Sequence, residues 1–248
     1  MPIEKNITND GILCVTMDNP PVNALNIPDS FEIADIFREL GNNDEVKVAI
    51  LTARGKGFCA GVDIKEIQGL PGAEGILQVN QACFEAFAAV YECAVPVIAA
   101  VNDFCLGSGV GLAGASDMVV AAEGAEFGLP EVDNGALGAL THLQRLVPIQ
   151  RARQMLYTCE TAPAEELKGY GTVYDVVEQE KLMDAATGLA QRIAAKPAKT
   201  IRAAKRSANG IDLTNIRDSY RYEQGYTFEL NLAGEGEKAR QAFLDGNR

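Results

Sequence analysis

The stretch VAILTARGKGFCAGVDIKE, from Val48 to Glu66, decides how this chain is expected to fold. It begins with apolar and β-branched residues, which are typical of a buried strand, and it ends in a glycine-rich turn. The glycines let backbone N–H groups come close to a ligand, and Arg54, Lys56 and Lys65 add three cations to an otherwise acidic chain. The segment predicts either a plain strand-to-helix turn or a turn that binds an anion.

Short β-rich runs alternate with helical patterns on both sides of this stretch. Strands are expected at 12–17, 46–52, 96–101, 117–122 and 173–177, and helices at 28–40 and 76–90. Beyond the last strand the spacing is helical over 180–196, 197–209 and 212–232. We therefore expect an α/β fold with a core over residues 1–195 and a helical C-terminal subdomain over residues 196–248.

Charge and composition exclude several classes of function. The chain has 22 Lys and Arg against 34 Asp and Glu, which gives a formal net charge of -12. A field of this sign repels phosphate backbones and anionic lipids, so we expect no nucleic-acid partner and no membrane partner. Uncharged stretches stay shorter than the roughly 18 residues that a membrane span needs. The first residues do not resemble a secretory signal, so we expect a cytoplasmic protein.

The histidine and cysteine content limits the possible chemistry further. His142 is the only histidine, so a histidine-rich metal site cannot form, and we expect no metal ligands. The six cysteines contain no C-x-x-C pair and lie in apolar stretches, which is typical of reduced thiols in a core. Cys59 beside the glycine turn is interpreted as such a core thiol rather than as a nucleophile.

A second glycine-rich run, LGSGVGLAG from Leu106 to Gly114, satisfies the dinucleotide-binding pattern G-x-G-x-x-G. A dinucleotide fold needs a longer helix before the next strand, yet a strand is already expected near Met118. The run fits a short helix whose N-terminal amides point into a pocket and stabilise an oxyanion. The alternative interpretation is that the small residues serve only close helix packing.

Candidate acids and bases follow in the segment from Ala125 to Leu146. Glu131 and Asp133 lie among mostly apolar neighbours, and burial there would raise a carboxyl pKa and favour acid–base chemistry. The alternative interpretation is that Glu131 and Asp133 are ordinary solvent-exposed carboxylates of a loop. His142 is either a structural histidine or a proton carrier. A carboxylate base predicts an acidic limb in the pH–rate profile, whereas a histidine base predicts a limb nearer neutrality.

Five segments in order resemble the crotonase (enoyl-CoA hydratase/isomerase) superfamily over almost the whole chain. They are NPPVNALN at 19–26, GFCAGVD at 57–63, PVIAAVN at 96–102, GSGVG at 107–111 and FGLPE at 127–131. The resemblance implies a spiral of β-β-α units, a C-terminal subdomain that forms trimers or paired trimers, and an acyl-CoA thioester as the partner. It implies no cofactor beyond the coenzyme A of the substrate.

The resemblance also assigns roles to individual residues. The backbone amides of Val62 and Ser108 would form the oxyanion hole, and Glu131 would be the catalytic carboxylate, with His142 as a second catalytic candidate. Ser108 departs from the family's usual glycine, a change that preserves the amide. Residues implied in coenzyme A binding are Asn23, Ala24, Lys56, Ala60, Val62, Asp63 and Ile64. The last residues, 241–248, lack the ending that contacts adenine in many members.

One departure from the family pattern bears on the reaction. Hydratases of the family use two glutamates, and this chain has Gly111 where the second one stands. The stretches 91–102, 135–143 and 223–234 most resemble a branch that opens a ketone ring of a CoA-linked intermediate in steroid (cholesterol) catabolism. We therefore expect hydrolytic carbon–carbon cleavage of a cyclic keto acyl-CoA. Alternatives are an enoyl-CoA isomerase, an atypical hydratase, an inactive oligomeric scaffold or an RNA-binding member.

Overall fold

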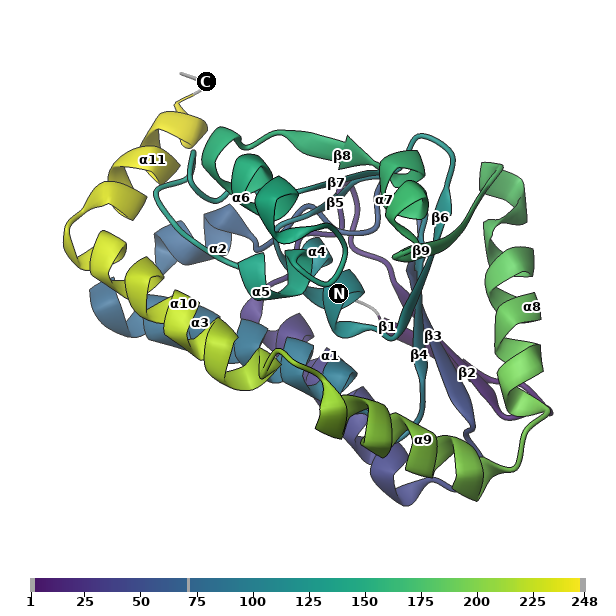
Figure 1. Ribbon diagram of the computed structural model, residues 1–248. Coiled ribbons are helices and arrows are strands. Elements are labelled where there is room, and N and C mark those ends of the chain that lie inside the picture. The colour runs from purple at the N-terminus through teal and green to yellow at the C-terminus, as the bar shows by residue number, and fades with distance from the viewer. Residues whose placement is uncertain (1–2, 71, 246–248) are drawn as a thin grey trace.

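The computed structural model describes residues 3–70 and 72–245 and confirms the expected α/β architecture (Figure 1). Its larger sheet has the strand order β1-β2-β3-β4-β6-β9, and all neighbours in it are parallel except the antiparallel pair β1 and β2. The strands are β1 Ile3–Ile7, β2 Ile12–Met17, β3 Val48–Ala53, β4 Val97–Val101, β6 Met118–Ala122 and β9 Val173–Val177.

A smaller sheet gives the fold its spiral form. It contains β5 (Cys105–Leu106), β7 (Glu126–Gly128) and β8 (Thr161–Pro163) in that order. The chain runs from β4 in the large sheet to β5 in the small one, enters helix α4 (Ser108–Ala115), and returns through β6 to β7. Two successive strands, one in each sheet, followed by a helix are the β-β-α unit that the family resemblance implies.

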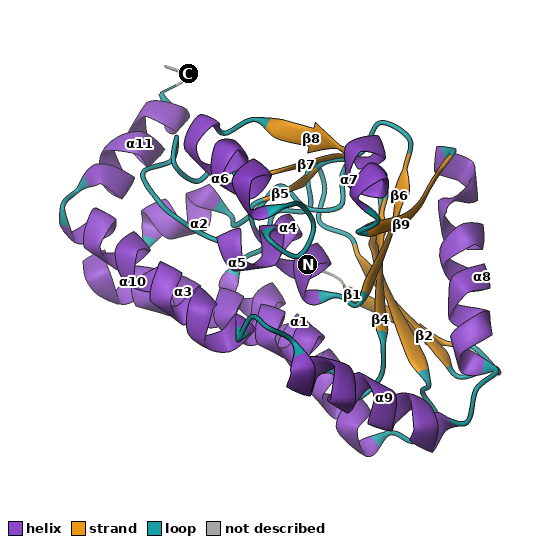
Figure 2. Cartoon of the chain, in the orientation of Figure 1, coloured by secondary structure: helices purple, strands orange, loops and turns teal. Residues whose placement is uncertain are grey.

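Helices cover both faces of the large sheet. All six residues of β3 are buried, because one face packs on α8 (Leu182–Ala194) and the other on the main core. Figure 2 shows α8 alone on one side of the sheet, with most other helices on the opposite side. Those helices include α1 (Ile27–Glu39) and α3 (Gly72–Tyr91), which pack on each other. The site lies within this second, thicker layer.

The three C-terminal helices are α9 (Ala198–Ile211), α10 (Ile216–Leu232) and α11 (Glu235–Leu244). Of these helices, α10 packs along α3, and α11 packs on α10 and α2 (Ile64–Gly69) (Figure 1). α10 begins later than the helical spacing predicts, because the side chain of Asn215 caps it by accepting a hydrogen bond from Asp218 N. The expected boundary at residues 195 and 196 falls between α8 and α9. The role of this region in trimer formation stays a prediction.

Several short elements escaped the sequence analysis. They are β1, β5, β7, β8, α2 (Ile64–Gly69), α5 (Leu140–Leu143), α6 (Ile149–Thr158), α7 (Ala164–Tyr170), α11 and the 3₁₀ turns Leu40–Asn42 and Gln179–Lys181. Within residues 3–70 and 72–245, no helix has both the length and the apolar character that crossing a bilayer requires.

Helix α4 is short and closely packed. It ends at Ala115, only three residues before β6, so a dinucleotide-binding helix is excluded as the sequence predicts. A Cβ on Gly109 would lie 2.7 Å from the carbonyl oxygen of Cys59, and one on Gly114 would lie 2.3 Å from that of His142. The glycines therefore serve close packing along the helix, while its first residue, Ser108, lines a pocket.

Candidate active site

Two turns that are distant in sequence lie side by side at the start of the site. Phe58 N donates a hydrogen bond to the carbonyl oxygen of Phe104 (2.9 Å), and Leu106 N donates to that of Cys59 (2.8 Å). These bonds fix the glycine turn after β3 against the entry to α4. A Cβ on Gly61 would lie 3.8 Å from Ser108 N, so the backbone after Gly61 passes close to the N-terminus of α4.

The amides of Val62 and Ser108 are free donors in this arrangement. Neither donates a hydrogen bond to any atom of the described residues, and both residues line one pocket. Ser108 is the first residue of α4, where a backbone N–H has no partner within the helix. Two unpaired amides from adjacent turns are the arrangement that an oxyanion hole requires.

Glu131 lines the same pocket and lies against the turn that carries Ser108. A Cβ on Gly107 would lie only 2.6 Å from Glu131 Oε1, and the φ angle of 54° at position 107 also suits glycine. The loop after Glu131 folds back on it, since the amides of Asn134 and Ala136 both donate to the Glu131 carbonyl oxygen at 2.9 Å. The carboxylate is therefore held next to the two free amides.

The surroundings of Glu131 favour its protonated form. Its Oε2 is buried and has no hydrogen-bond partner among the described residues. Burial raises the pKa of Glu131 to about 8, and the negative charge of Glu223 on α10 adds to the shift. A carboxylate with a raised pKa is a stronger base than an ordinary glutamate, which suits proton transfer near neutral pH.

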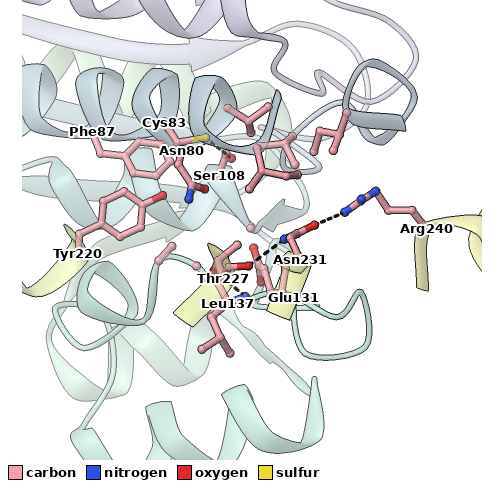
Figure 3. Close-up of a pocket in the computed structure, with 18 residues that line it drawn as sticks. Asn80, Cys83, Phe87, Ser108, Glu131, Leu137, Tyr220, Thr227, Asn231 and Arg240 are labelled. Carbon is pink, nitrogen blue, oxygen red and sulfur yellow. Dashed lines mark hydrogen bonds between the residues drawn. The ribbon is translucent and has the colours of Figure 1, made fainter. Parts of the chain in front are cut away.

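The pocket lies between the core and the C-terminal helices (Figure 3). Its volume is about 90 Å³. Helix α3 supplies an apolar wall that includes Cys83 and Phe87, while α10 and α11 supply Tyr220, Asn231 and Arg240. Segments more than 100 residues apart therefore close one pocket around Glu131.

His142 is outside this pocket lining. The residue is fully buried, and its ring meets the rings of Phe87 and Tyr220 edge-on at 5.1 and 5.0 Å between centroids. Burial lowers the pKa of His142 to about 3, and the positive charge of Arg145 contributes. Neither ring nitrogen has a hydrogen-bond partner in the described part of the chain. His142 is therefore neutral, and it contacts two aromatic rings that line the pocket without lining the pocket itself.

Two other candidates named from the sequence also lie away from the pocket lining. Asp133 is exposed on the loop two residues beyond Glu131. Cys59 is fully buried, and burial raises the pKa of its thiol to about 12. The structure therefore brings Glu131, Val62 and Ser108 together and leaves Asp133, His142 and Cys59 outside that group.

The residues expected to bind coenzyme A form one backbone-linked cluster beside the site. Asn23 is buried, and its Nδ2 donates to the carbonyl oxygens of Arg54 (2.8 Å) and Gly57 (2.9 Å). Further bonds run from Ala60 N to Val22 O and from Asp63 N to Leu25 O, next to Ala24 and Ile64. Lys56 is exposed at the turn. The cluster shapes the turn, and its contact with coenzyme A stays a prediction.

Four pocket or near-pocket residues were missed by sequence reasoning: Tyr220, Glu223, Asn231 and Arg240. All four belong to α10 and α11. They were missed because an isolated polar residue in an amphipathic helix is normally predicted to face solvent. Glu223 is buried instead, and both its oxygens accept a hydrogen bond from Leu140 N at 3.1–3.2 Å. Only the packing of α10 on α3 and α5 reveals these positions.

Comparison with known proteins places this chain in a family. The enoyl-CoA hydratase/isomerase family profile matches residues 7–245. A hydrolase of (7aS)-7a-methyl-1,5-dioxo-2,3,5,6,7,7a-hexahydro-1H-indene-carboxyl-CoA from Rhodococcus jostii (strain RHA1) is 51% identical over 99% of this chain and 95% of its own length. A Mycobacterium tuberculosis (strain ATCC 25618 / H37Rv) protein of the same name is also 51% identical, over 98% of this chain and 99% of its own.

The fold comparison agrees. The crystal structure of an enoyl-CoA hydratase from Mycobacterium avium subsp. paratuberculosis K-10 superimposes with a TM-score of 0.85 at 26% identity, covering 98% of this chain and 95% of the other. The spiral fold, the family profile and the two closely similar hydrolases agree with one another, and the chain belongs to the enoyl-CoA hydratase/isomerase, or crotonase, family of acyl-CoA enzymes.

Proposed function

We propose that this enzyme opens the ring of a cyclic keto acyl-CoA by hydrolysing a carbon–carbon bond, in the breakdown of a steroid skeleton. One observation carries the proposal: Glu131 is the one carboxylate among the described residues that line the pocket, it lies beside two free amides, and the ring of Phe87 occupies the space that a side chain at position 111 would need. Hydrolases of a dioxo-indene carboxyl-CoA that are 51% identical to this chain support the choice of substrate.

The proposed reaction uses the three residues in sequence. The amides of Val62 and Ser108 hold the thioester oxygen, and each such donor is worth about 3 to 4 kcal/mol when charge develops there. Glu131 takes a proton from water, and the resulting hydroxide adds to the ring ketone. The carbon–carbon bond then breaks, and its electron pair moves into the thioester enolate.

The last step returns the proton from Glu131 to the substrate. The enolate carbon takes a proton from the Glu131 carboxylic acid. The attacked carbon becomes a carboxylic acid group, which stays attached to the acyl group through the other side of the opened ring. One water is consumed, and nothing is oxidised or reduced. The chemistry therefore needs no cofactor beyond the coenzyme A of the substrate. A base whose pKa lies near 8 can both accept and return a proton at neutral pH.

A labelling experiment tests this proposal. The dioxo-indene carboxyl-CoA is incubated with the enzyme in water enriched in heavy oxygen, and the product is analysed by mass spectrometry. Ring hydrolysis predicts one heavy oxygen atom in the new carboxyl group, and Glu131→Gln should suppress its formation. Conversion without added mass would instead support an isomerase that moves one proton with Glu131, and free coenzyme A without ring opening would indicate thioester hydrolysis.

We also propose that the enzyme acts in the cytoplasm as a homotrimer or homohexamer whose C-terminal helices form the subunit contacts. Large apolar side chains on and between these helices are exposed in the single chain, including Ile211, Leu213 and Leu232. Apolar surface of this kind favours association. Sedimentation velocity of the full chain tests the assembly, and a monomer at micromolar concentration would contradict it.

A further inference from the structure

Arg240 on α11 is a cation at the edge of the pocket that holds Glu131 (Figure 3). The residue is half-buried and also lines an adjoining cavity of about 280 Å³ between α2, α3 and the C-terminal helices. Ile67, Ile76, Asn231 and Arg240 are common to both cavities. Arg240 therefore stands where the two spaces meet.

The partners of Arg240 are neutral amides. Its Nη1 donates to Asn231 Oδ1 (2.9 Å) and its Nε donates to Gln68 Oε1 (3.3 Å). Among the described residues, no carboxylate lies within ion-pair distance of Arg240. Ion pairs with carboxylates are formed instead by Arg38, Arg54, Arg145, Arg151 and Arg217. The charge of Glu237, which is on the same helix and lines the same adjoining cavity, acts on Arg240 only from beyond ion-pair distance. Arg240 therefore lines the pocket without a direct carboxylate partner among the described residues.

The neighbours of Arg240 hold it in place. Asn231 Nδ2 donates to the carbonyl oxygen of Thr227 (2.8 Å), which fixes Asn231 Oδ1 towards Arg240. A Cβ on Gly236 would lie 2.5 Å from Asn231 Oδ1 and 2.9 Å from Arg240 Nη1, so glycine leaves the space that the pair needs. A guanidinium has five N–H donors, and two of them are used here. The remaining donors are available to a ligand.

From this arrangement we infer that Arg240, positioned by Asn231, binds the carboxylate that ring opening creates on the acyl group, and the oxyanion that precedes it at the attacked ketone. This inference rests on the proposed function. Hydrolysis develops negative charge at two oxygens, and the amides of Val62 and Ser108 serve only the thioester oxygen. The second charge needs its own donor, and the planar fork of arginine matches a carboxylate in two hydrogen bonds.

Binding measurements test the inference without relying on turnover. Succinyl-, adipoyl- and suberoyl-CoA carry a terminal carboxylate, and butyryl-, hexanoyl- and octanoyl-CoA are their uncharged counterparts. Isothermal calorimetry of the full chain should show, for at least one chain length, a preference of about tenfold or more for the carboxylate, because a hydrogen-bonded charge pair contributes more than one tenfold step. Arg240→Met should remove the preference and leave binding of the uncharged thioester within about twofold.

A second variant keeps Arg240 but pairs its charge with a carboxylate of the protein. Asn231→Asp places a carboxylate against the guanidinium, so the preference for terminal carboxylates should fall to near one although Arg240 remains. Arg240→Lys should retain part of the preference, because lysine keeps the charge and loses the fork. Lys238→Met, on the exposed face of the same helix, is the matched control and should keep the wild-type preference.

The outcomes separate this inference from the proposed function. A wild-type enzyme with no carboxylate preference at any chain length, or an Arg240→Met variant that keeps the preference, overturns the inference. If the ring is opened and Arg240→Met has an unchanged kcat/KM, the function stands and the inference fails. If no ring opening occurs but the preference depends on Arg240, the carboxylate site stands and the proposed reaction fails.

Discussion

The ring of Phe87 fills the space into which any side chain at position 111 would project. A Cβ on Gly111 would lie 2.4 Å from both Cε2 and Cζ of Phe87. The sequence lacks the family's second glutamate, and Phe87 fills the space that the side chain of that glutamate would need. This pairing between α3 and α4 leaves Glu131 as the one carboxylate among the described residues that line the pocket.

Gly111→Glu should fail to create a hydratase. The wild-type enzyme should hydrate crotonyl-CoA slower than a dedicated hydratase by about two to four powers of ten, since one acid–base group is missing. Inserting the glutamate against Phe87 should also destabilise the fold by about 1–3 kcal/mol. An absorbance assay and chemical denaturation measure the two effects. Efficient hydration by either protein would contradict the one-carboxylate interpretation.

Glu131→Gln should keep ligand binding and lower the rate of ring opening by about two to four powers of ten. A base must be ionised to act, so the wild-type kcat/KM should rise with pH until about 8, where the buried carboxyl group loses its proton. The variant should lose this limb. A rate that is independent of pH between about 6 and 9 in the wild type would remove Glu131 from the role of base.

Glu223→Gln should change the pH dependence of both stability and activity. Burial raises the pKa of Glu223 from the usual range of a glutamate to about 7, so the unfolded chain releases this proton at lower pH than the folded chain. Stability from this group is full at acidic pH and is lost as the pH rises through about 7. The glutamine oxygen can still accept from Leu140 N, so the variant should be less sensitive to pH in urea denaturation.

The same variant should affect Glu131. Removing the negative charge of Glu223 eliminates one cause of the raised Glu131 pKa, so the limb of the activity profile should move to lower pH. The rate above the limb should stay within a few-fold of the wild type, because Glu223 holds the start of α5 and does not line the pocket. An unmoved limb would show that the two carboxylates do not interact.

Ser108→Pro tests the oxyanion assignment because proline removes the amide itself. Position 108 is the first residue of α4, where proline is well tolerated and the amide has no helical partner. Thermal unfolding should therefore change little, while the rate should fall by about a hundredfold or more. Ser108→Gly, which keeps the amide, is the control and should be mild. A folded Ser108→Pro enzyme with full activity would exclude this amide.

The local elements of the core could be predicted because their signals are short-range. The buried strand β3, the turn after it and the short helix α4 each follow from apolar runs and glycines within about 20 residues. Strands β5, β7 and β8 were missed because two or three residues carry no periodicity. Helix α11 was missed because its pattern differs little from that of an exposed segment.

The site could be predicted only where the backbone or a motif defines it. Val62 and Ser108 lie on turns fixed by glycine, and the FGLPE motif selects Glu131 over Asp133, whereas composition alone leaves these two carboxylates equivalent. From the sequence alone, a carboxylate base is expected to give a more acidic limb of the pH–rate profile than a histidine base, and the pKa shifts in the structure reverse this order. Burial raises the pKa of Glu131 to about 8 and lowers that of His142 to about 3, so the carboxylate titrates above the histidine. Desolvation by distant segments has no local sequence signal.

Because the pocket is divided between the core and the hairpin of helices α10 and α11, any undocking of these helices would make substrate affinity depend on the docked fraction. Glu131 belongs to the core, whereas Tyr220, Asn231 and Arg240 belong to the hairpin. If the hairpin is docked in only a fraction of molecules, the apparent dissociation constant rises by the inverse of that fraction. Bound acyl-CoA would in turn slow hydrogen exchange in α10 and α11. Anything that clamps or loosens this hairpin would tune the enzyme without altering its acid–base group.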